Sequence, residues 1–422
     1  MISTPIKETI LWAVDDSSNE IVSFLQQLMR IDSETGREGR LQEFIGSTLR
    51  DMGLQVDSWV VDTRELEGHP AFIPIDGMNF EGRPNVVGIL KGEPDTRWLL
   101  LNGHVDTITG KPLSEWIDSP FSGALRDGRI CGRGASDMKG GLAAMTMAVK
   151  VLLDAGLKPR GTVLLEYVVD EEVTGYGTLS AIIRGYKADA GICAETSDMA
   201  VQPACVGRLW FTVDIAGNSA SISNRWEAVD TIQKGIKIVQ AVEDLEKMRH
   251  EDLHHPLYPD NRGAMPCAVC MFNAGTFPSA TPDRAVLKGS MGLLPFEDVQ
   301  EVKAQFAAQI ERVARADPWM RNHPPRISFK DVGADGDEIS VDHPIVQTVS
   351  RAFQQAPGSP PVISGRMGGA DTRYLIKYGD TPTVIFGPGV TSQMHAMNEL
   401  VPVANLIQAT KAMALAIHDW CR

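Results

Sequence analysis

Five short stretches of this sequence place a histidine or a carboxylate beside glycine or after a run of apolar residues. They are residues 102–107, 132–141, 169–172, 194–196 and 394–399. Histidine nitrogens and carboxylate oxygens are suitable ligands for zinc and related divalent ions. A single polar residue at a loop carries little information, because such residues are common there. Five stretches of the same character predict a shared metal site.

His104 and Asp106 are two residues apart, so in an extended chain they would point to the same side. That spacing suits a histidine ligand whose ring is held by a carboxylate behind it. Asp137 lies in the glycine-rich loop at 132–141, which opens a predicted helix, and its two oxygens could bridge two metal ions. A phosphate-binding loop is the alternative there, but neither of the usual glycine spacings is present.

Residues 170–172 are adjacent carboxylates, which are unfavourable together unless a cation lies near. A solvated acidic turn is the common alternative. We expect Glu172 to bind metal, and Glu171 to take the proton of a bound water and pass it to the leaving amine. With Glu195 and His395, the ligand set suits two zinc ions, or cobalt or manganese in their place. The charge of two divalent ions would exceed that of the three carboxylate ligands, Asp137, Glu172 and Glu195. The remaining positive charge would favour binding the water as hydroxide.

The elements that position these residues follow from apolar patterns. Short apolar runs predict strands buried on both faces, at residues 98–101, 163–165, 190–193 and 383–386. Helical spacing of apolar residues predicts helices at 21–31, 41–49 and 142–152. Alternating strands and helices predict an α/β domain with a mainly parallel sheet and helices on both faces. Such sheets place ligands beyond the carboxyl ends of their strands, where the five stretches lie.

The middle of the chain has a different pattern. Strands and helices are predicted in the order strand 209–215, helix 226–248, strands near 268–272 and 285–294, helix 299–313 and strand 326–329. This order is that of a split βαβ, ferredoxin-like α+β module. The sequence therefore predicts a catalytic domain in two parts, 1–206 and 332–422, with an inserted domain at 207–331.

Composition narrows the functional classes. A length of 422 residues favours two domains, and a net charge of −14 argues against nucleic acid as a partner. No apolar run approaches the ~20 residues that span a bilayer, and the N-terminus lacks the pattern of a secretory signal. Six cysteines do not form a disulfide framework, and the Cys267–Cys270 pair is interpreted as two buried thiols on a strand. We therefore expect a cytoplasmic protein that is not bound to membranes.

Together these motifs resemble the zinc-dependent deacylase and exopeptidase family that includes acetylornithine deacetylase, succinyl-diaminopimelate desuccinylase, aminoacylase and carboxypeptidase G. The resemblance covers nearly the whole chain. It includes Gly-Arg-Pro-Asn-Val-Val-Gly at 82–88, the Asp137 loop, the Asp-Glu-Glu and Ala-Glu-Thr turns, Gly-Gly-Ala-Asp-Thr-Arg at 368–373 and His395. The order and long spacing of these motifs make the likeness specific.

The resemblance also implies roles for individual residues. One metal ion is held by His104, Asp137 and Glu195, and the other by Asp137, Glu172 and His395. By the same likeness Asp106 orients His104, Glu171 is the general base, Arg373 grips a substrate carboxylate and Asn398 lines the pocket. The inserted domain is implied to be a lid through which the family forms homodimers.

The sequence departs from the family in the inserted domain. Family members carry a histidine in a G-x-x-x-H pattern that enters the partner subunit's site and stabilises the oxyanion, whereas Ser221 stands here. Ala280 and Gly292 stand where an asparagine and a strand arginine are expected. Histidines 250, 254 and 255 are expected to face solvent, and a less favoured alternative lets one of them replace the lid histidine.

The predicted function is hydrolysis of an amide bond in a small N-acyl amino acid or related non-peptide amide by a metal-bound hydroxide. A dipeptidase or carboxypeptidase is the first alternative. A metal-loaded binding protein that has lost catalysis because the lid histidine is Ser221 is the second, and a homodimeric scaffold without metal is the third.

Overall fold

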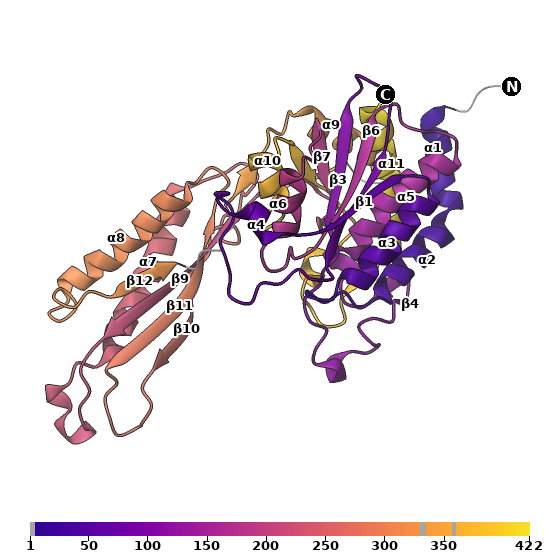
Figure 1. The fold of residues 1–422 in the computed structure, drawn as a ribbon. Coiled ribbons are helices and arrows are strands. Elements are labelled where there is room, and N and C mark those ends of the chain that lie inside the picture. Colours follow the sequence, from indigo (N-terminus) through magenta and orange to yellow (C-terminus); the bar gives the residue numbers. More distant parts are fainter. Residues whose placement is uncertain (1–4, 330–334, 357–359) are drawn as a thin grey trace. The chain divides into compact units, whose positions relative to one another are not determined.

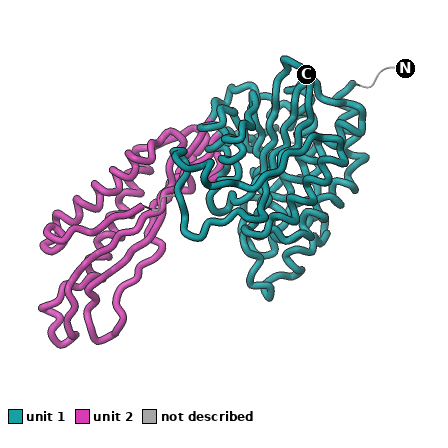
Figure 2. The backbone as a smooth tube through the Cα atoms, in the orientation of Figure 1, with its two compact units in different colours: residues 1–203, 339–364, 370–422 teal, residues 204–338, 365–369 magenta. Residues whose placement is uncertain are grey.

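The computed structural model describes residues 5–329, 335–356 and 360–422 (Figure 1). Figure 2 shows the two units into which the chain divides. Unit 1 comprises Met1–Pro203, Ile339–Ser364 and Ala370–Arg422, and unit 2 comprises Ala204–Glu338 and Gly365–Gly369. The expected insertion, 207–331, falls inside the long segment of unit 2. The residue at which the second catalytic part was expected to begin, Val332, lies outside the described residues.

A mainly parallel sheet forms the middle of unit 1. Its parallel strands are β3 (Trp98–His104), β6 (Thr162–Val168), β7 (Ala190–Cys193) and β15 (Thr383–Ile385). The antiparallel strands β1 (Gln55–Val60) and β2 (Pro84–Leu90) extend one edge, and β8 (Val201–Cys205) pairs with β15. Every residue of β6 is buried, as the apolar runs predict for a sheet covered on both faces.

Helices lie on both sides of this sheet, so the α/β fold class is confirmed (Figure 1). One side holds α2 (Ser18–Met29), α3 (Gly39–Asp51), α5 (Gly140–Asp154) and α11 (Val403–Trp420), and the other holds α4 (Thr63–Leu66), α6 (Tyr176–Ile183) and α10 (Thr372–Lys377). Two further helices, α1 (Ile6–Asp16) and α9 (Pro344–Gln355), pack against α11. None of the described helices is both long and apolar enough to cross a membrane.

Short elements complete unit 1 around the candidate site. A small antiparallel sheet contains β4 (Ala124–Arg126), β5 (Arg129–Cys131) and β16 (Leu400–Pro402). Single helical turns lie at η1 (Leu113–Glu115) and η4 (Thr391–Gln393), and η2 (Ala135–Lys139) is a kinked segment in which Asp137 and Met138 have non-helical backbone angles. The connecting segments contain two short strands, β13 (Asp337–Glu338) and β14 (Ile363–Arg366).

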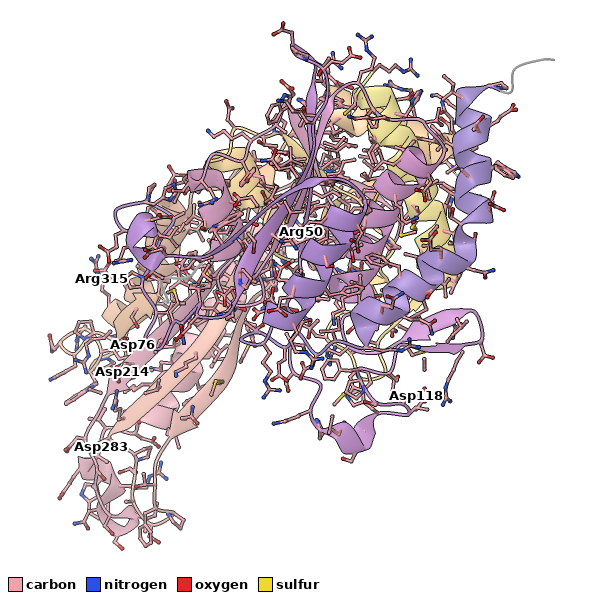
Figure 3. The ribbon with its side chains drawn as sticks, turned by 45° about the vertical axis from the view of Figure 1, so that its right-hand side comes forward. Arg50, Asp76, Asp118, Asp214, Asp283 and Arg315 are labelled. Carbon is pink, nitrogen blue, oxygen red and sulfur yellow. The ribbon has the colours of Figure 1, made fainter. Side chains whose placement is uncertain are left out.

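Unit 2 has the strand and helix order expected for the split βαβ module. The elements are β9 (Gly207–Ala216), η3 (Ile222–Glu227), α7 (Thr231–Asp252), β10 (Cys267–Ala274), β11 (Arg284–Leu293), α8 (Val299–Ala316) and β12 (Arg326–Phe329). All pairs in the sheet are antiparallel, in the order β10-β11-β9-β12. Alternate residues of β9 are buried. Asp214, labelled in Figure 3, belongs to the other face of β9, and it pairs with Arg284 at 2.9 Å.

Two expectations about single residues in unit 2 are wrong. Cys267 is buried but Cys270 is exposed, because residues three apart on a strand point to opposite faces of the sheet. His255 was expected to face solvent. Its Nε2 instead lies 2.9 Å from the Glu338 carboxylate, and only 9% of its side chain is exposed.

Candidate metal centre

The predicted ligands and the predicted base, Glu171, lie after the ends of strands or just before a helix in unit 1. His104 is the last residue of β3, Glu171 and Glu172 follow β6, Glu195 follows β7, His395 comes after β15 and η4, and Asp137 lies in η2 before α5. Because β3, β6, β7 and β15 are parallel neighbours, their carboxyl ends meet at one edge of the sheet. Polar residues that are far apart in the sequence therefore lie together in the fold.

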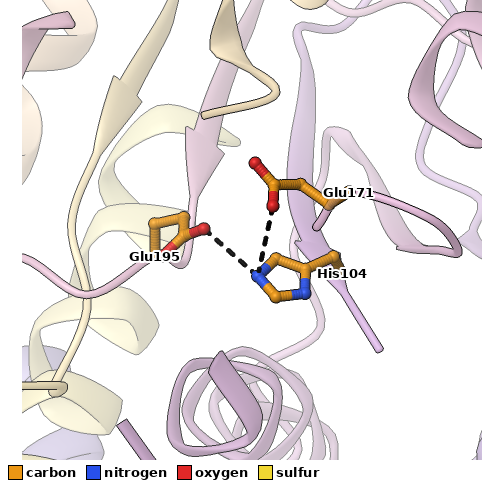
Figure 4. Close-up of side chains that lie close together, drawn as sticks. All are labelled: His104, Glu171 and Glu195. Carbon is orange, nitrogen blue, oxygen red and sulfur yellow. Dashed lines mark ion pairs between the residues drawn. The ribbon is translucent and has the colours of Figure 1, made fainter. Parts of the chain in front are cut away.

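Two groups of three side chains gather at this edge. One contains His104, Glu171 and Glu195, and the other Asp137, Glu172 and His395; within each group the candidate ligand atoms lie within 4.8 Å of one another. Figure 4 shows His104 Nε2 between its two acids, 4.0 Å from Glu171 Oε2 and 3.3 Å from Glu195 Oε1.

Asp137 lies between the two histidines. Its Oδ1 is 3.2 Å from Nε2 of His104, and its Oδ2 is 3.3 Å from Nε2 of His395. Nε2 of His395 is also 3.0 Å from Glu172 Oε2. The five predicted ligands thus form one continuous cluster, with Asp137 at its centre. The side chain of His395 is 49% exposed, whereas that of His104 is 1% exposed, so the cluster opens to solvent beside His395.

Asp106 supports the cluster in two ways. Nδ1 of His104 lies 3.0 Å from the backbone carbonyl of Asp106 and 3.5 Å from its carboxylate, so the carbonyl is the nearer partner. The Asp106 carboxylate accepts hydrogen bonds from the backbone N–H of Glu171 at 3.1 Å and of Glu172 at 3.2 Å. This fully buried carboxylate therefore fixes the turn that carries both glutamates.

Buried negative charge dominates the electrostatics of the cluster. Burial raises the pKa of Glu171 well above its ordinary value; the charge of His104 opposes the rise, and nearby carboxylates, first Asp371 and then Glu195, add to it. Burial and the charge of Asp137 raise the pKa of Glu172. Acids in such surroundings are stabilised by cations.

The pKa values of the two histidines are raised as well, which in their case favours the charged form. Burial tends to lower the pKa of His104, but its contacts with Asp106, Asp137 and Glu195 raise it well above the ordinary value. The carboxylates of Asp137 and Glu172 raise the pKa of His395 to about 10. Imidazole nitrogens facing buried carboxylates form the mixed nitrogen and oxygen donor set of zinc and related ions, so the residues present fit divalent metal ions.

A second buried ion network lies behind the acidic turn. Nη2 of Arg83 is 2.6 Å from Asp170 and 2.7 Å from Glu38, and all three side chains are nearly inaccessible. Asp170 directly precedes the two glutamates of the cluster, so Arg83 anchors the start of their turn. Arg83 belongs to the motif at 82–88, but its residue type and position in the sequence alone do not indicate this role.

The predicted substrate-binding residues of unit 1 lie in different surroundings. Nη2 of Arg373 donates to the carbonyl of Thr174 at 3.2 Å, and its guanidinium carbon lies 4.6 Å from the centre of the Tyr374 ring. The side chain of Asn398 holds another loop: its Oδ1 accepts the N–H of Ile117 at 2.7 Å, and its Nδ2 donates to Glu115 at 3.2 Å. Its amide is therefore already engaged by the segment around η1.

The three departures from the family pattern lie in unit 2. Ser221 is the N-cap of η3, and it forms an antiparallel bridge with Ala280, so two of the departures are direct neighbours. Gly292 faces Arg208 across β11 and β9. A Cβ atom at Gly292 would lie 2.1 Å from the carbonyl oxygen of Ala264, which explains why no larger residue stands there.

Comparisons with known proteins agree with this geometry. The family described as Peptidase family M20/M25/M40 matches residues 100–419. N-formyl-4-amino-5-aminomethyl-2-methylpyrimidine deformylase of Halalkalibacterium halodurans is 29% identical, over 100% of this chain and 99% of that protein. Succinyl-diaminopimelate desuccinylase of Rhodopseudomonas palustris is 27% identical, over 93% of this chain and 96% of that protein. A tripeptidase of Staphylococcus aureus shares the fold, with a TM-score of 0.74 at 20% identity over 96% of this chain and 99% of that one.

Proposed function

The chain belongs to Peptidase family M20/M25/M40, and from this premise we propose that it hydrolyses the amide bond of a small, non-peptide N-acyl compound with the help of two divalent metal ions. The observation that carries the proposal is the convergence of His104, Asp137, Glu172, Glu195 and His395 at one sheet edge, with Glu171 beside them. The deformylase and the desuccinylase among its relatives are both named for removing an acyl group.

The ligands divide around Asp137. We assign His104, Asp137 and Glu195 to one ion and Asp137, Glu172 and His395 to the other, because each oxygen of Asp137 faces a different histidine. Bound there, the ions would polarise the substrate carbonyl and acidify a water molecule. Zinc suits this donor set, with cobalt or manganese as substitutes.

Glu171 is the group that moves the proton. Its carboxylate lies at the cluster but is not assigned as a ligand, since Nε2 of His104 is 4.0 Å from Glu171 and only 3.3 Å from Glu195. It accepts a proton from the attacking water and delivers it to the leaving nitrogen. Asp106 keeps it in place by accepting the backbone N–H groups of the turn.

The substrate is a compact amide whose acyl part is short. We propose formyl, acetyl or succinyl groups as the acyl class, because the relatives with near-complete coverage are named for formyl and succinyl removal. Arg373 is the residue proposed to bind a substrate carboxylate, and Asn398 to shape the pocket by holding residues 115–117. Ser221 stands where the family has the lid histidine. We propose that Ser221 binds substrate in its place, through a hydroxyl instead of an imidazole.

We further propose a cytoplasmic homodimer that forms through unit 2. The strand β10 is at an edge of its sheet, and Met271 and Phe272 on it are 52% and 37% exposed. An apolar edge strand is a natural site for pairing with a second copy. All six cysteines are free thiols, which supports a reducing compartment.

The function is tested with protein stripped of metal and then loaded with zinc, cobalt or manganese. N-formyl, N-acetyl and N-succinyl amines and amino acids are assayed beside dipeptides, by measuring the acid or amine released. We expect metal-dependent release of a short acyl group. Metal-loaded protein that cleaves only dipeptides would overturn the substrate class, and protein that cleaves none of these compounds would overturn the proposed function.

A further inference from the structure

We propose that Glu399 is a positioning residue of the metal centre, whose carboxylate holds the backbone before Asp137 so that Asp137 faces both histidines. This inference rests on the proposed function, since it gives Asp137 its role as the shared ligand. Glu399 lies four residues after His395, and its side chain is fully buried.

The Glu399 carboxylate receives four hydrogen bonds from one short segment. Its Oε1 accepts the N–H of Ser136 at 2.8 Å and that of Asp137 at 2.9 Å. Its Oε2 accepts the N–H of Gly134 at 2.9 Å and a guanidinium N–H of Arg133 at 2.8 Å. Residues 133–137 therefore wrap around a single side chain.

The backbone around Glu399 adds to this arrangement. Its carbonyl accepts the N–H of Gly132 at 2.8 Å, and the next residue, Leu400, pairs with Cys131 in β16 and β5. The segment after His395 and the segment before Asp137 are thus joined through Glu399 by both backbone and side chain. Asp137 and His395, which lie 3.3 Å apart, belong to these two segments.

The geometry needs a carboxylate and not merely a polar side chain. All four groups that contact Glu399 are donors, so the side chain must offer acceptors at both oxygens. In a Glu399→Gln variant the amide oxygen would still accept two N–H groups. The amide nitrogen would face the N–H groups of Gly134 and Arg133. Because all of these groups are donors, no hydrogen bond could form there, and residues 133–137 would have to move.

Movement of this segment would alter both halves of the metal centre. Each oxygen of Asp137 lies within 3.3 Å of a different histidine, so rotating its backbone cannot keep both contacts. Residues that hold ligands in place typically change metal affinity about 10- to 100-fold when they are replaced. We expect an effect of that size from Glu399→Gln without loss of the fold.

The matched control is Glu297→Gln in unit 2. Glu297 is also a largely buried glutamate, and it accepts a guanidinium N–H of Arg249 at 2.9 Å and the N–H of Leu294 at 2.8 Å. The substitution removes the same charge from a similar setting, but in the unit that does not contain the metal centre.

The experiment titrates metal-free wild type and both variants with Zn²⁺ and Co²⁺ against a competing chelator, and records the visible absorption of bound Co²⁺. We expect two ions in wild type and in Glu297→Gln. In Glu399→Gln at least one ion should bind about 10- to 100-fold more weakly, with an altered Co²⁺ spectrum. Wild-type affinity and spectrum in Glu399→Gln would overturn the inference.

Hydrogen exchange of the metal-free proteins separates this inference from the proposed function. Peptides covering residues 133–137 should exchange faster in Glu399→Gln than in wild type, and equal rates would overturn the role of Glu399. If wild type binds no pair of ions, the proposed function fails, whatever the exchange shows. If Glu399→Gln does not fold, Glu399→Asp, which keeps the charge but is shorter, is measured in its place with the same expected outcomes.

Discussion

Glu171 and Glu172 are adjacent acids with different surroundings. Glu172 lies 3.0 Å from His395 and can bind an ion together with it and Asp137. Glu171 is farther from its histidine, at 4.0 Å from His104. The difference in contacts supports the proposal that Glu172 binds metal and Glu171 transfers the proton.

Replacing Glu171 by glutamine should therefore separate catalysis from metal binding. Glutamine has the same size but cannot accept a proton, so we expect kcat to fall about 100- to 10,000-fold. Metal content, measured by elemental analysis, should stay at the wild-type value. Turnover that stays within a factor of about three of wild type would contradict the role of Glu171 as the base.

The proposed ligands His104, Glu172 and Glu195 could be expected to lie together, because each follows an apolar run and parallel strands bring such ends together. The residues that hold the ligands could not be predicted in the same way. Asp106 and Glu399 act on backbone N–H groups of segments 65 and 262 residues away, respectively, and the sequence carries no mark of such a pairing. Sequence patterns indicate which side chains are present, but not which distant amides they reach.

At the scale of elements, local apolar patterns predicted strands such as β3 and helices such as α5, but not others such as β1 and α11. Residues 365–369 belong to unit 2, although they lie beyond the predicted insertion, because membership depends on packing with segments remote in sequence. No local pattern reveals that membership. The exposure of Cys270, in contrast, follows from its odd spacing from Cys267, since residues three apart on a strand point to opposite faces.

The start of α5 packs closely against the turn that carries Glu195. A Cβ atom at Gly141 would lie 1.8 Å from the carbonyl oxygen of Ala194, a backbone atom that cannot move alone. We expect Gly141→Ala to lower the free energy of unfolding by about 1–3 kcal/mol, measured by urea denaturation.

Gly46 in α3 provides the matched control for this substitution. A Cβ atom there would lie 3.6 Å from the flexible side chain of Arg50, an ordinary contact. Because glycine is unfavourable inside a helix, Gly46→Ala should raise the free energy of unfolding by up to about 1 kcal/mol. If both substitutions changed the free energy of unfolding equally, close packing at Gly141 could not be the cause of its effect.

At the scale of the whole molecule, the two units have separate apolar cores and should respond to different conditions. In unit 2, Asp317 accepts the N–H of Met320 through Oδ1 and the ammonium groups of Lys234 and Lys237 through Oδ2. Burial alone would raise the pKa of Asp317, but these contacts hold it well below its ordinary value.

The stability that Asp317 contributes should be lost in acid. Its pKa is lowered in the folded state, so the contribution is complete above the unfolded pKa of about 3.9 and declines as pH falls below it. Asp317→Asn keeps an oxygen for the N–H groups but loses the charge. We expect a cost of about 1–2 kcal/mol at pH 7 that shrinks near pH 3, measured by urea denaturation. A cost that is the same at both pH values would contradict this linkage.

Removing metal should instead destabilise unit 1. Ions that bind only the folded cluster stabilise it by about 2.7 kcal/mol at 100 times Kd, which corresponds to a rise in Tm of roughly 5–10 °C. Calorimetry with zinc and with a chelator should therefore move the transition of unit 1, while that of unit 2, which lacks the cluster, stays in place. Hydrogen exchange during heating assigns each transition to its unit. Equal shifts of both transitions would mean that the ions bind elsewhere or that the units unfold together, and the metal centre would then no longer account for the stability of unit 1 alone.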